Sequence, residues 1–231
     1  MVRTLDKSLQ SCSESHRIKT DRSVLFLQET DLSVSLYLMS TAAARRPARD
    51  RILDTASELF YAHGIHAVGV DRLIAESGVA KATLYKQFHS KDDVVAAYLR
   101  RMDESWRRQL RSAALAAGDD PREQLLGVFA ALEHAAREGT LGCAFINAAA
   151  EYAPGSTAHA ITAEHKRAVR DWIRTLAAAA GAADPDTLAF QLALLIDGTL
   201  AATRVEGAAE AAEAARLVAH TLLDAACPGH P

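Results

Sequence analysis

Five neighbouring side chains, from Lys81 to Lys86, have the types and spacing that contact with a nucleic acid requires. Lys81 and Lys86 carry ammonium groups, Thr83 and Tyr85 carry hydroxyls, and Ala82 is small enough to permit close approach. Ammonium and hydroxyl groups bind phosphate oxygens, and lysine also reaches guanine edges in the major groove. Taken singly, each of these residues would equally suit a solvated helix face. They can contact a nucleic acid together only if secondary-structure elements place them on one surface.

Those elements are predicted to be three short helices. The first ends at about Ala62 and has an apolar stripe of Ile52, Ala56, Leu59 and Phe60 at helical spacing. The second begins near Val70, and Gly78 ends it, because glycine adopts a positive φ at little cost. The third, residues 81–89, buries Leu84 and Phe88. A turn this short makes the last two helices cross steeply, which predicts a helix-turn-helix at about residues 70–89.

A fourth helix is expected to begin directly after this motif. Ser90-Lys91-Asp92-Asp93 fits the capping signature in which a serine side chain caps the helix and an acid follows three residues later. Lys91 adds positive charge at the N-terminus of that helix, where phosphate binds readily. Arg49 belongs to a basic run, Arg45, Arg46, Arg49 and Arg51, that leads into the first helix, and this run suits either DNA contact or a solvated tail.

The segment from about Pro47 to Met102 resembles the DNA-binding domain of the tetracycline repressor (TetR) family. The residues that match in order and spacing are Phe60, Gly64, Ile74, Gly78-Val79, Thr83-Leu84-Tyr85, Phe88 and Ser90-Lys91-Asp92. Gly69 and Ala80 depart from the pattern, since a hydroxyl residue that could cap a helix or bind phosphate often stands at each position. The expected DNA contacts are Arg49, Lys81, Ala82, Thr83, Tyr85, Lys86 and Lys91.

The distribution of charge agrees with DNA binding, although the net charge is −3. Residues 39–102 hold ten Lys and Arg against seven Asp and Glu, whereas residues 103–231 hold eleven against seventeen. The basic excess therefore coincides with the helix-turn-helix and the arm before it, as binding to phosphates requires. No run reaches the roughly 18 consecutive apolar residues of a membrane helix, so we expect a soluble protein.

The cysteines and histidines indicate neither a disulfide framework nor a metal site. Cys12, Cys143 and Cys227 form no C-x-x-C motif, and without a secretory signal a reducing cytoplasm is the expected setting. The nine histidines show no ligand spacing with a carboxylate, so no metal and no cofactor is expected. Cys143 could be an enzyme nucleophile, but no recognisable motif pairs it with a histidine or carboxylate.

The first 38 residues differ in composition from the remainder. They contain no Ala, Gly or Pro, whereas the later sequence is rich in alanine. We expect residues 1–38 to be a disordered extension or the product of a mis-assigned start, with Met39 as the alternative start and a short hairpin as a further alternative. Residues 39–46 are expected to form a basic arm.

The remainder of the chain is predicted to be helical. Gly and Pro clusters divide it into six helices at about residues 91–117, 121–137, 143–152, 156–180, 185–205 and 208–226. With the first three, these give an all-α fold of about nine helices. The TetR resemblance implies a DNA-binding domain at residues 47–106, followed by a ligand-binding and dimerisation domain at residues 107–231.

The last two helices are apolar on most sides. Such a helical pair either packs into its own core or forms a four-helix bundle with a second copy. In the TetR family this pair is the usual dimer interface, and a dimer reads a palindrome with two recognition helices. The residues expected at the interface are Phe190, Leu194, Leu195, Gly198, Leu217 and Leu222.

The resemblance also implies a pocket for a small-molecule effector between the DNA-binding helices and this pair. Aromatic walls with a few polar anchors are typical of such sites, although most of these residues would suit a core equally well. The candidates are Trp106, Phe129, Phe145, Asn147, Glu151, Tyr152, His165, Trp172 and Gln191.

Three functions are compatible with these features. The leading hypothesis is a homodimeric repressor that binds a palindromic operator and is released by an effector. The second is a DNA-binding architectural factor without a ligand, which a pocket poor in polar residues would favour. The third is a helical enzyme that uses Cys143.

Overall fold

A computed structural model describes residues 46–137, 139, 141–206 and 209–228; the predictions for residues 1–38 and most of those for the arm at 39–46 lie outside these ranges. The described residues form nine α-helices and no strand, which confirms the predicted all-α fold. The helices are α2 (Ala48–His63), α3 (Val70–Ser77), α4 (Lys81–Gln87), α5 (Lys91–Ala116), α6 (Pro121–Arg137), α7 (Ala144–Glu151), α8 (Thr157–Ala179), α9 (Pro185–Glu206) and α10 (Ala209–Ala226).

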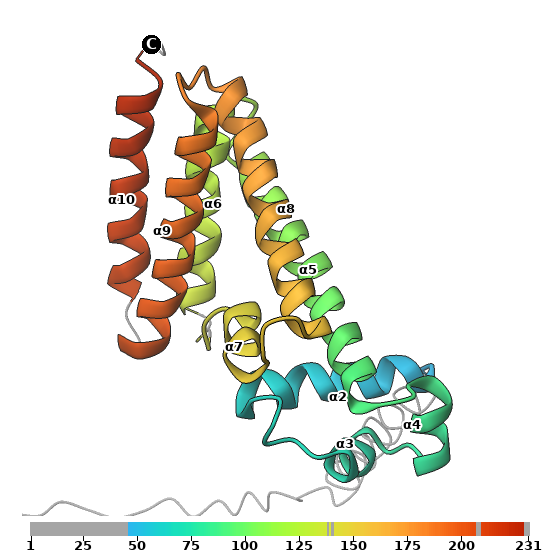
Figure 1. Cartoon of the computed structure of the whole chain (residues 1–231). Helices are drawn as coiled ribbons and strands as arrows, with labels where there is room; N and C mark the ends of the chain where they lie inside the picture. Colours follow the sequence, from blue (N-terminus) through green and yellow to red (C-terminus); the bar gives the residue numbers. More distant parts are fainter. Residues whose placement is uncertain (1–45, 138, 140, 207–208, 229–231) are drawn as a thin grey trace, which may run out of the picture. The chain divides into compact units, whose positions relative to one another are not determined.

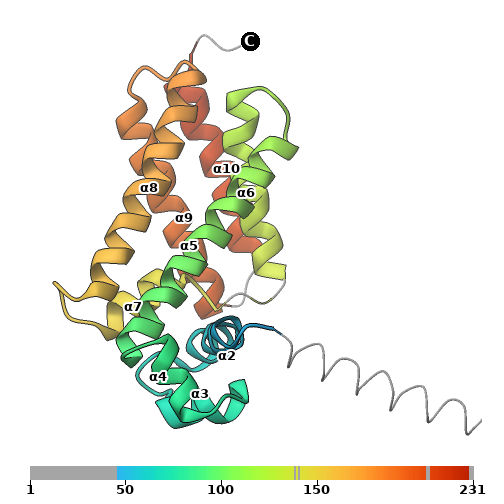
Figure 2. The same cartoon turned by 90° about the vertical axis from the view of Figure 1, so that its right-hand side faces the viewer.

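Residues 47–231 make one compact unit, in which the three short helices α2, α3 and α4 pack around the first turns of α5. Figure 1 shows this group at one end of α5, and a bundle of α5, α6, α8, α9 and α10 beyond it. In Figure 2, α5 runs from the short helices into the bundle, where it packs against α6 and α8. This long helix is therefore shared by both groups.

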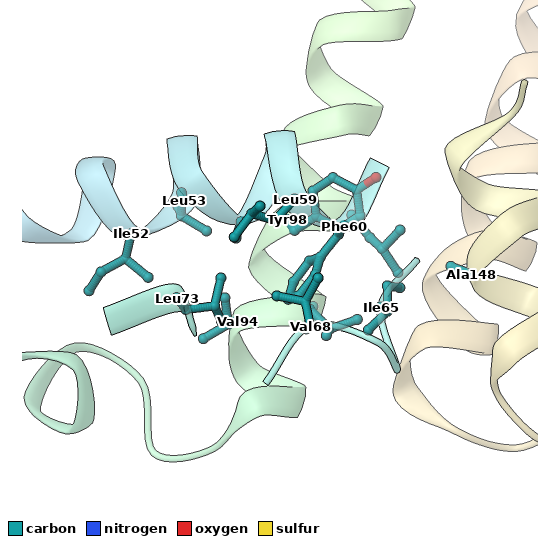
Figure 3. Packing of buried hydrophobic residues seen from close by; sticks show 14 of the residues in the cluster. Ile52, Leu53, Leu59, Phe60, Ile65, Val68, Leu73, Val94, Tyr98 and Ala148 are labelled. Atoms are coloured by element: carbon teal, nitrogen blue, oxygen red, sulfur yellow. The ribbon is translucent and has the colours of Figure 1, made fainter. Parts of the chain in front are cut away.

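The short helices share a hydrophobic core with the start of α5 (Figure 3). Ile52, Leu73 and Leu84 from three different helices are fully buried, and the Phe60 ring meets the Tyr98 ring edge to face at 5.5 Å between centroids. Ala148 of α7 belongs to the same core. The apolar stripes predicted from the sequence are thus packed against one another, which fixes the orientation of α4.

A second core fills the bundle and draws on α5, α6, α8, α9 and α10. Gly127 of α6 is needed there, because a Cβ at this position would lie 2.7 Å from the carbonyl oxygen of Ala113 on α5. The two helices can therefore approach closely only with glycine at the contact. Leu110 and Leu125, from the same pair of helices, are almost fully buried beside it.

The predicted helix boundaries hold to within one or two residues, and α4 differs most. It ends at Gln87 instead of residue 89, because Phe88 has extended backbone (φ −142°, ψ 124°) while its ring is buried. The chain then enters α5 with Ser90 as its cap. The Ser90 hydroxyl accepts a hydrogen bond from the Asp93 N–H, and the Asp93 carboxylate accepts one from the Ser90 N–H, both at 3.1 Å. This confirms the predicted capping box.

Candidate nucleic-acid interface and ligand cavity

Helices α3 and α4 are joined by a turn at Gly78. Gly78 has φ +63° and ψ +29°, the left-handed conformation that side chains with a Cβ rarely adopt. The residues before the two helices, Gly69 and Ala80, have extended backbone and make no side-chain capping bond. The turn therefore depends on glycine, while the N-termini of both helices leave backbone N–H groups without a side-chain cap.

The outer face of α4 carries the residues expected to contact DNA. Lys81, Ala82, Tyr85 and Lys86 are exposed, and Thr83 is half-buried at the edge of the face. Lys81 lies 3.8 Å from Asp71, but both side chains are well exposed, so this ion pair contributes little and leaves the ammonium accessible. Two ammonium groups and a phenol hydroxyl thus share one solvent-facing surface, which we call the α4 face.

Arg49 is exposed, but its guanidinium turns toward the end of α4. It lies 4.4 Å from the centre of the Phe88 ring and donates to the Gln87 carbonyl oxygen at 3.3 Å. Arg51, which was not among the predicted contacts, donates to the Gly78 carbonyl oxygen at 3.4 Å. In this arrangement the two arginines hold the helix-turn-helix against α2, and Arg49 is not directed outward with the α4 face.

Lys91 is half-buried at the start of α5. Burial lowers its pKa, and the neighbouring carboxylates of Glu151 and Asp92 partly offset that effect. Tyr152 donates to Asp92 at 3.2 Å, and burial together with this carboxylate raises the pKa of Tyr152 to about 12. Lys91 therefore lies among residues of α7 as well as at the N-terminus of α5.

Glu151, predicted to line the pocket, instead joins α7 to the loop after α2. Its carboxylate accepts hydrogen bonds from the N–H groups of Ile65 at 2.8 Å and His66 at 2.6 Å. Gly64, which precedes them, brings the loop so close that a Cβ there would lie 3.2 Å from the carboxylate. Two charge-assisted hydrogen bonds thus attach the DNA-binding helices to the rest of the unit.

Tyr61, near the end of α2, forms a second set of hydrogen bonds to the rest of the unit. We call the Glu151 hydrogen bonds and the Tyr61 hydrogen bonds the two joints. The Tyr61 hydroxyl accepts a hydrogen bond from the Leu141 N–H and donates one to the Gly142 carbonyl oxygen, both at 2.9 Å. The Leu141 carbonyl oxygen accepts hydrogen bonds from Arg204 of α9 and, at 3.2 Å, from Asn147. Asn147 therefore supports the loop before α7 and is not among the residues that line the cavity described below.

Gly142 permits the close approach of α9 to this loop. Its φ is +86°, and a Cβ there would lie 2.9 Å from the Arg204 Cδ. Tyr61 and Gly142 also line the internal cavity described next. The second joint is therefore part of the cavity wall.

The cavity has a volume of about 90 Å³ and lies between α5, α7, α8 and α9. Three of the predicted residues line it, namely Trp106, Phe145 and His165. The remaining walls are mostly apolar, with Met102 on α5 and Val169 on α8 among them. Aromatic walls with few polar groups are typical of small-molecule sites.

The other predicted pocket residues lie elsewhere, for reasons of packing. Phe129 is 1% exposed inside the second core, and Trp172 packs against the same core. Gln191 is exposed on α9, and Tyr152 is held by Asp92 beside α5. A periodic sequence pattern shows that a side chain is apolar or polar, but it does not tell a cavity wall from a filled core.

The polar side chains in the cavity come mainly from α8. His165 is 3% exposed; its Nδ1 lies 2.7 Å from the Asp103 carboxylate, and its ring stacks on Phe145 with 3.6 Å between centroids. Burial lowers the pKa of His165, and the Asp103 hydrogen bond only partly offsets this. Lys166 forms an ion pair with Asp197 of α9. Its ammonium also lies 3.5 Å from the Cys143 sulfur.

Sequence reasoning did not find Lys166, Asp197 or Asp103. Lys166 and Asp197 are far apart in the sequence, and each reads as an ordinary surface charge. A weak signal was present, because residues 193, 196, 197 and 200 follow helical spacing and place one acid within an apolar stripe of α9. Only the packing of α8 on α9 brings that acid to the lysine.

Helices α9 and α10 leave part of their apolar surface uncovered. Phe190 is 50% exposed, Leu194 57% and Leu217 60%, and Gly198 of α9 is also exposed. These four residues, together with the exposed Val205 and Val218, are here called the α9–α10 face. Leu195 and Leu222 differ, since both are half-buried against the second core. By length and composition α9 could span a membrane, with a mean hydropathy of 1.4. It packs, however, against α6, α8 and α10 within the bundle.

A family model described as bacterial regulatory proteins, tetR family, matches residues 52–98. The structure is similar to that of a TetR-family transcriptional regulator from Streptomyces coelicolor, with 34% identity and a TM-score of 0.73 over 78% of this chain and 96% of that one. The chain belongs to the TetR family of transcriptional regulators. As a TetR-family regulator it binds DNA and is not an enzyme.

Curated relatives match only part of this TetR-family chain. The transcriptional activator FasR of Mycolicibacterium smegmatis is 36% identical over 35% of this chain, and the match spans 36% of FasR. The transcriptional repressor ComR of Escherichia coli is 28% identical over 55% of this chain, and the match spans 61% of ComR. The chain thus spans less than two thirds of the length of each relative. One of the two relatives is named an activator and the other a repressor.

Proposed function

We propose that this TetR-family regulator is a homodimeric repressor that a small molecule releases from a palindromic operator. The observation that carries the proposal is the cavity, because Tyr61 belongs both to its wall and to the first DNA-binding helix. The same cavity contains His165, Lys166 and Asp197. Polar groups placed in an apolar cavity favour a ligand-responsive regulator over a ligand-independent architectural factor.

The α4 face supports the proposed DNA contact. Lys81, Lys86, Tyr85 and Thr83 would bind phosphates or base edges, with Ala82 permitting close approach to the groove. Arg49 would act by holding α4 in place, since its guanidinium lies over Phe88. Lys91 would add positive potential near the backbone. One such helix gives little discrimination, so the proposal requires two copies spaced by about one turn of DNA, roughly 34 Å.

The α9–α10 face supports the proposed dimer. Phe190, Leu194 and Leu217 are large apolar side chains that one chain leaves exposed, and Gly198 allows another helix to approach closely. Pairing of α9 and α10 with their copies would form a four-helix bundle and bury this surface. Within the cytoplasm, where its DNA lies, the regulator would act in this dimeric form.

Ligand binding would act on DNA through the two joints. A ligand that moves the loop at 141–142 disturbs the Tyr61 hydroxyl, and one that moves α7 disturbs the Glu151 carboxylate. Either change shifts α2, and through the shared core also α4. Release requires only that the ligand bind the DNA-incompetent arrangement more tightly, by a few kcal/mol.

The direct test is fluorescence anisotropy with a palindromic DNA fragment from next to the gene for this chain. We expect specific binding at low salt, a steep loss as salt rises, and a stoichiometry of two chains per palindrome. Leu194→Glu should give monomers in sedimentation and lose specific binding, whereas Glu164→Gln, on the exposed surface of α8, should change neither. Failure to bind any genomic fragment would overturn the proposal.

The sign of regulation needs its own measurement, because FasR is named an activator and ComR a repressor. Transcription from the bound promoter should fall when the regulator is added. If transcription rises instead, the chain is an activator, and the proposed DNA contacts stand without the proposed repression.

A further inference from the structure

His165 presents a hydrogen-bonding atom to the cavity that no part of the described chain satisfies. Its ring is 97% buried and lines the cavity, and Nδ1 is bonded to Asp103. None of the hydrogen bonds formed by the described residues uses the other ring nitrogen, Nε2. A ligand that reaches this nitrogen can therefore form a hydrogen bond that the chain itself does not supply.

The neighbours of His165 determine whether Nε2 donates or accepts. Asp103 also pairs with Arg107 at 2.8 Å, and a carboxylate can only accept, so Nδ1 carries the proton that faces it. Burial lowers the pKa of His165, which keeps the ring neutral at neutral pH. Nε2 is then the unprotonated nitrogen and an acceptor. A ligand must therefore place a donor, such as a hydroxyl, at Nε2.

Lys166, the next residue of α8, requires an acceptor on the ligand instead of a donor. Its ammonium has three N–H groups, of which one faces the Asp197 carboxylate and one the Cys143 sulfur. The third is left for an acceptor on the ligand. A neutral carbonyl oxygen suits it, because the Asp197 carboxylate already balances the charge of Lys166.

The volume of the cavity limits the ligand to a small molecule. An apolar cavity of about 150 Å³ holds one benzene ring in an engineered example, and this cavity is smaller, at about 90 Å³. It adjoins a groove of about 240 Å³ that shares Lys166, Ala193 and Asp197 with it, so part of a ligand can extend past Lys166. The rings of Phe145 and Trp106 in the wall favour an aromatic ligand.

We propose that the ligand is a single-ring aromatic compound with a hydroxyl that donates to His165 Nε2 and a carbonyl oxygen that accepts from the Lys166 ammonium. The inference rests on the proposed ligand-responsive function and names the class of its effector. Asp103 is a positioning residue in this site, because it fixes the ring form of His165 without contact to the ligand.

Calorimetry on the full chain without DNA tests the proposal separately from DNA binding and release. The probes are 4-hydroxyacetophenone, 4-methylacetophenone, which replaces the donor by a methyl group of similar size, and 4-ethylphenol, which lacks the carbonyl. We expect the first to bind at least about ten-fold more tightly than either analogue, as one hydrogen bond to a buried partner implies. Equal affinities, or no binding of any probe at millimolar concentration, would overturn the proposal.

Variants of His165 test whether its Nε2 atom causes the preference for the probe with a hydroxyl. His165→Phe keeps a ring that can stack on Phe145 but removes the acceptor, so the ratio between 4-hydroxyacetophenone and 4-methylacetophenone should fall to about one. His159→Phe, on the same helix but outside the cavity wall, should keep the wild-type ratio. His165→Gln, which retains an acceptor, should keep part of it. If His165→Phe retains the full ratio, His165 is not the acceptor. If circular dichroism shows that His165→Phe does not fold, the ratios measured for the wild type and for His165→Gln test the proposal instead.

Discussion

The α4 face and the cavity hold their polar groups in opposite ways. On the α4 face, Lys86 and Tyr85 are exposed, and the ion pair of Lys81 lies in water. In the cavity, His165 is bonded to Asp103, stacked on Phe145 and almost fully buried. Substitutions on the α4 face should therefore change binding without changing stability. Substitutions in the cavity and its joints should change both, because the same bonds hold the fold together.

The largest expected effect belongs to the α4 face. In the double variant Tyr85→Ala/Lys86→Ala, operator affinity should fall about 100-fold, since each lost DNA contact is worth roughly 1–3 kcal/mol. The melting temperature should stay the same, because both side chains are exposed. Anisotropy titrations and thermal melts measure the two quantities. Arg167→Ala, an exposed cation on α8, serves as the matched control, and unchanged affinity in the double variant would refute the docking face.

Glu151→Ala should lower the free energy of unfolding by about 2 kcal/mol, because two N–H groups lose a charged acceptor. It should also weaken operator binding, since the loop after α2 is released. Urea titration gives the first quantity and anisotropy the second. A loss confined to DNA affinity would contradict the distinction drawn between the two regions. Glu164→Ala provides a control without such bonds.

Stability should decline in mild acid because of His165. Burial lowers the pKa of the folded-state imidazole below its ordinary value of 6.5, so the unfolded chain takes up the proton at higher pH. The stabilisation is complete above pH 6.5 and is lost as pH falls below it, by at most about 1.4 kcal/mol per pH unit for one proton. Asp103, Lys166 and Asp197 are the charged groups that act on the ring.

Urea titrations between pH 7.5 and 5.5 measure this decline, with His165→Gln as the reference for all other titrating groups. The wild-type curve should fall more steeply than that of the variant. Parallel curves would mean that His165 takes up its proton equally in both states, which is the behaviour of an exposed histidine.

Tyr61→Phe should lower the free energy of unfolding by about 1 kcal/mol, less than Glu151→Ala, because partly exposed loop groups can turn to water when the hydroxyl is removed. Tyr85→Phe, which removes an exposed hydroxyl, should leave the free energy of unfolding unchanged. The sharper readout is the ligand response. If Tyr61 couples ligand binding to DNA release, the variant should still bind 4-hydroxyacetophenone but release less DNA. Full release of DNA by the variant would show that the Tyr61 hydrogen bonds are not needed for this coupling.

The same contrast explains how much could be predicted from the sequence. Helix boundaries and the helix-turn-helix depend on local signals, such as Gly78 at the turn and Ser90 at the cap, and these were correctly predicted. The end of α4 was not, because Phe88 leaves the helix to bury its ring between other elements. Of the cavity residues, Trp106, Phe145 and His165 were predicted from the sequence.

The remaining cavity residues depend on how distant helices pack. Asp197 meets Lys166 only because α9 lies on α8, and Tyr61 reaches the cavity wall from a helix assigned to DNA binding. Phe129 and Trp172 have the same residue types as Phe145 and Trp106, yet only Phe145 and Trp106 line the cavity. Hydrophobic periodicity contains no information that separates these pairs.

Helix α9 has a consequence for engineering a sensor with new specificity. This helix supplies Ile196, Asp197 and Leu200 to the cavity and Phe190 and Leu194 to the adjoining α9–α10 face, and Arg204 holds the loop at its end. If α9 forms the proposed dimer interface, its redesign would disturb assembly together with ligand recognition. The cavity residues on α7 and α8, such as Phe145 and Val169, offer positions where a library can be varied without changing the face proposed to form the dimer.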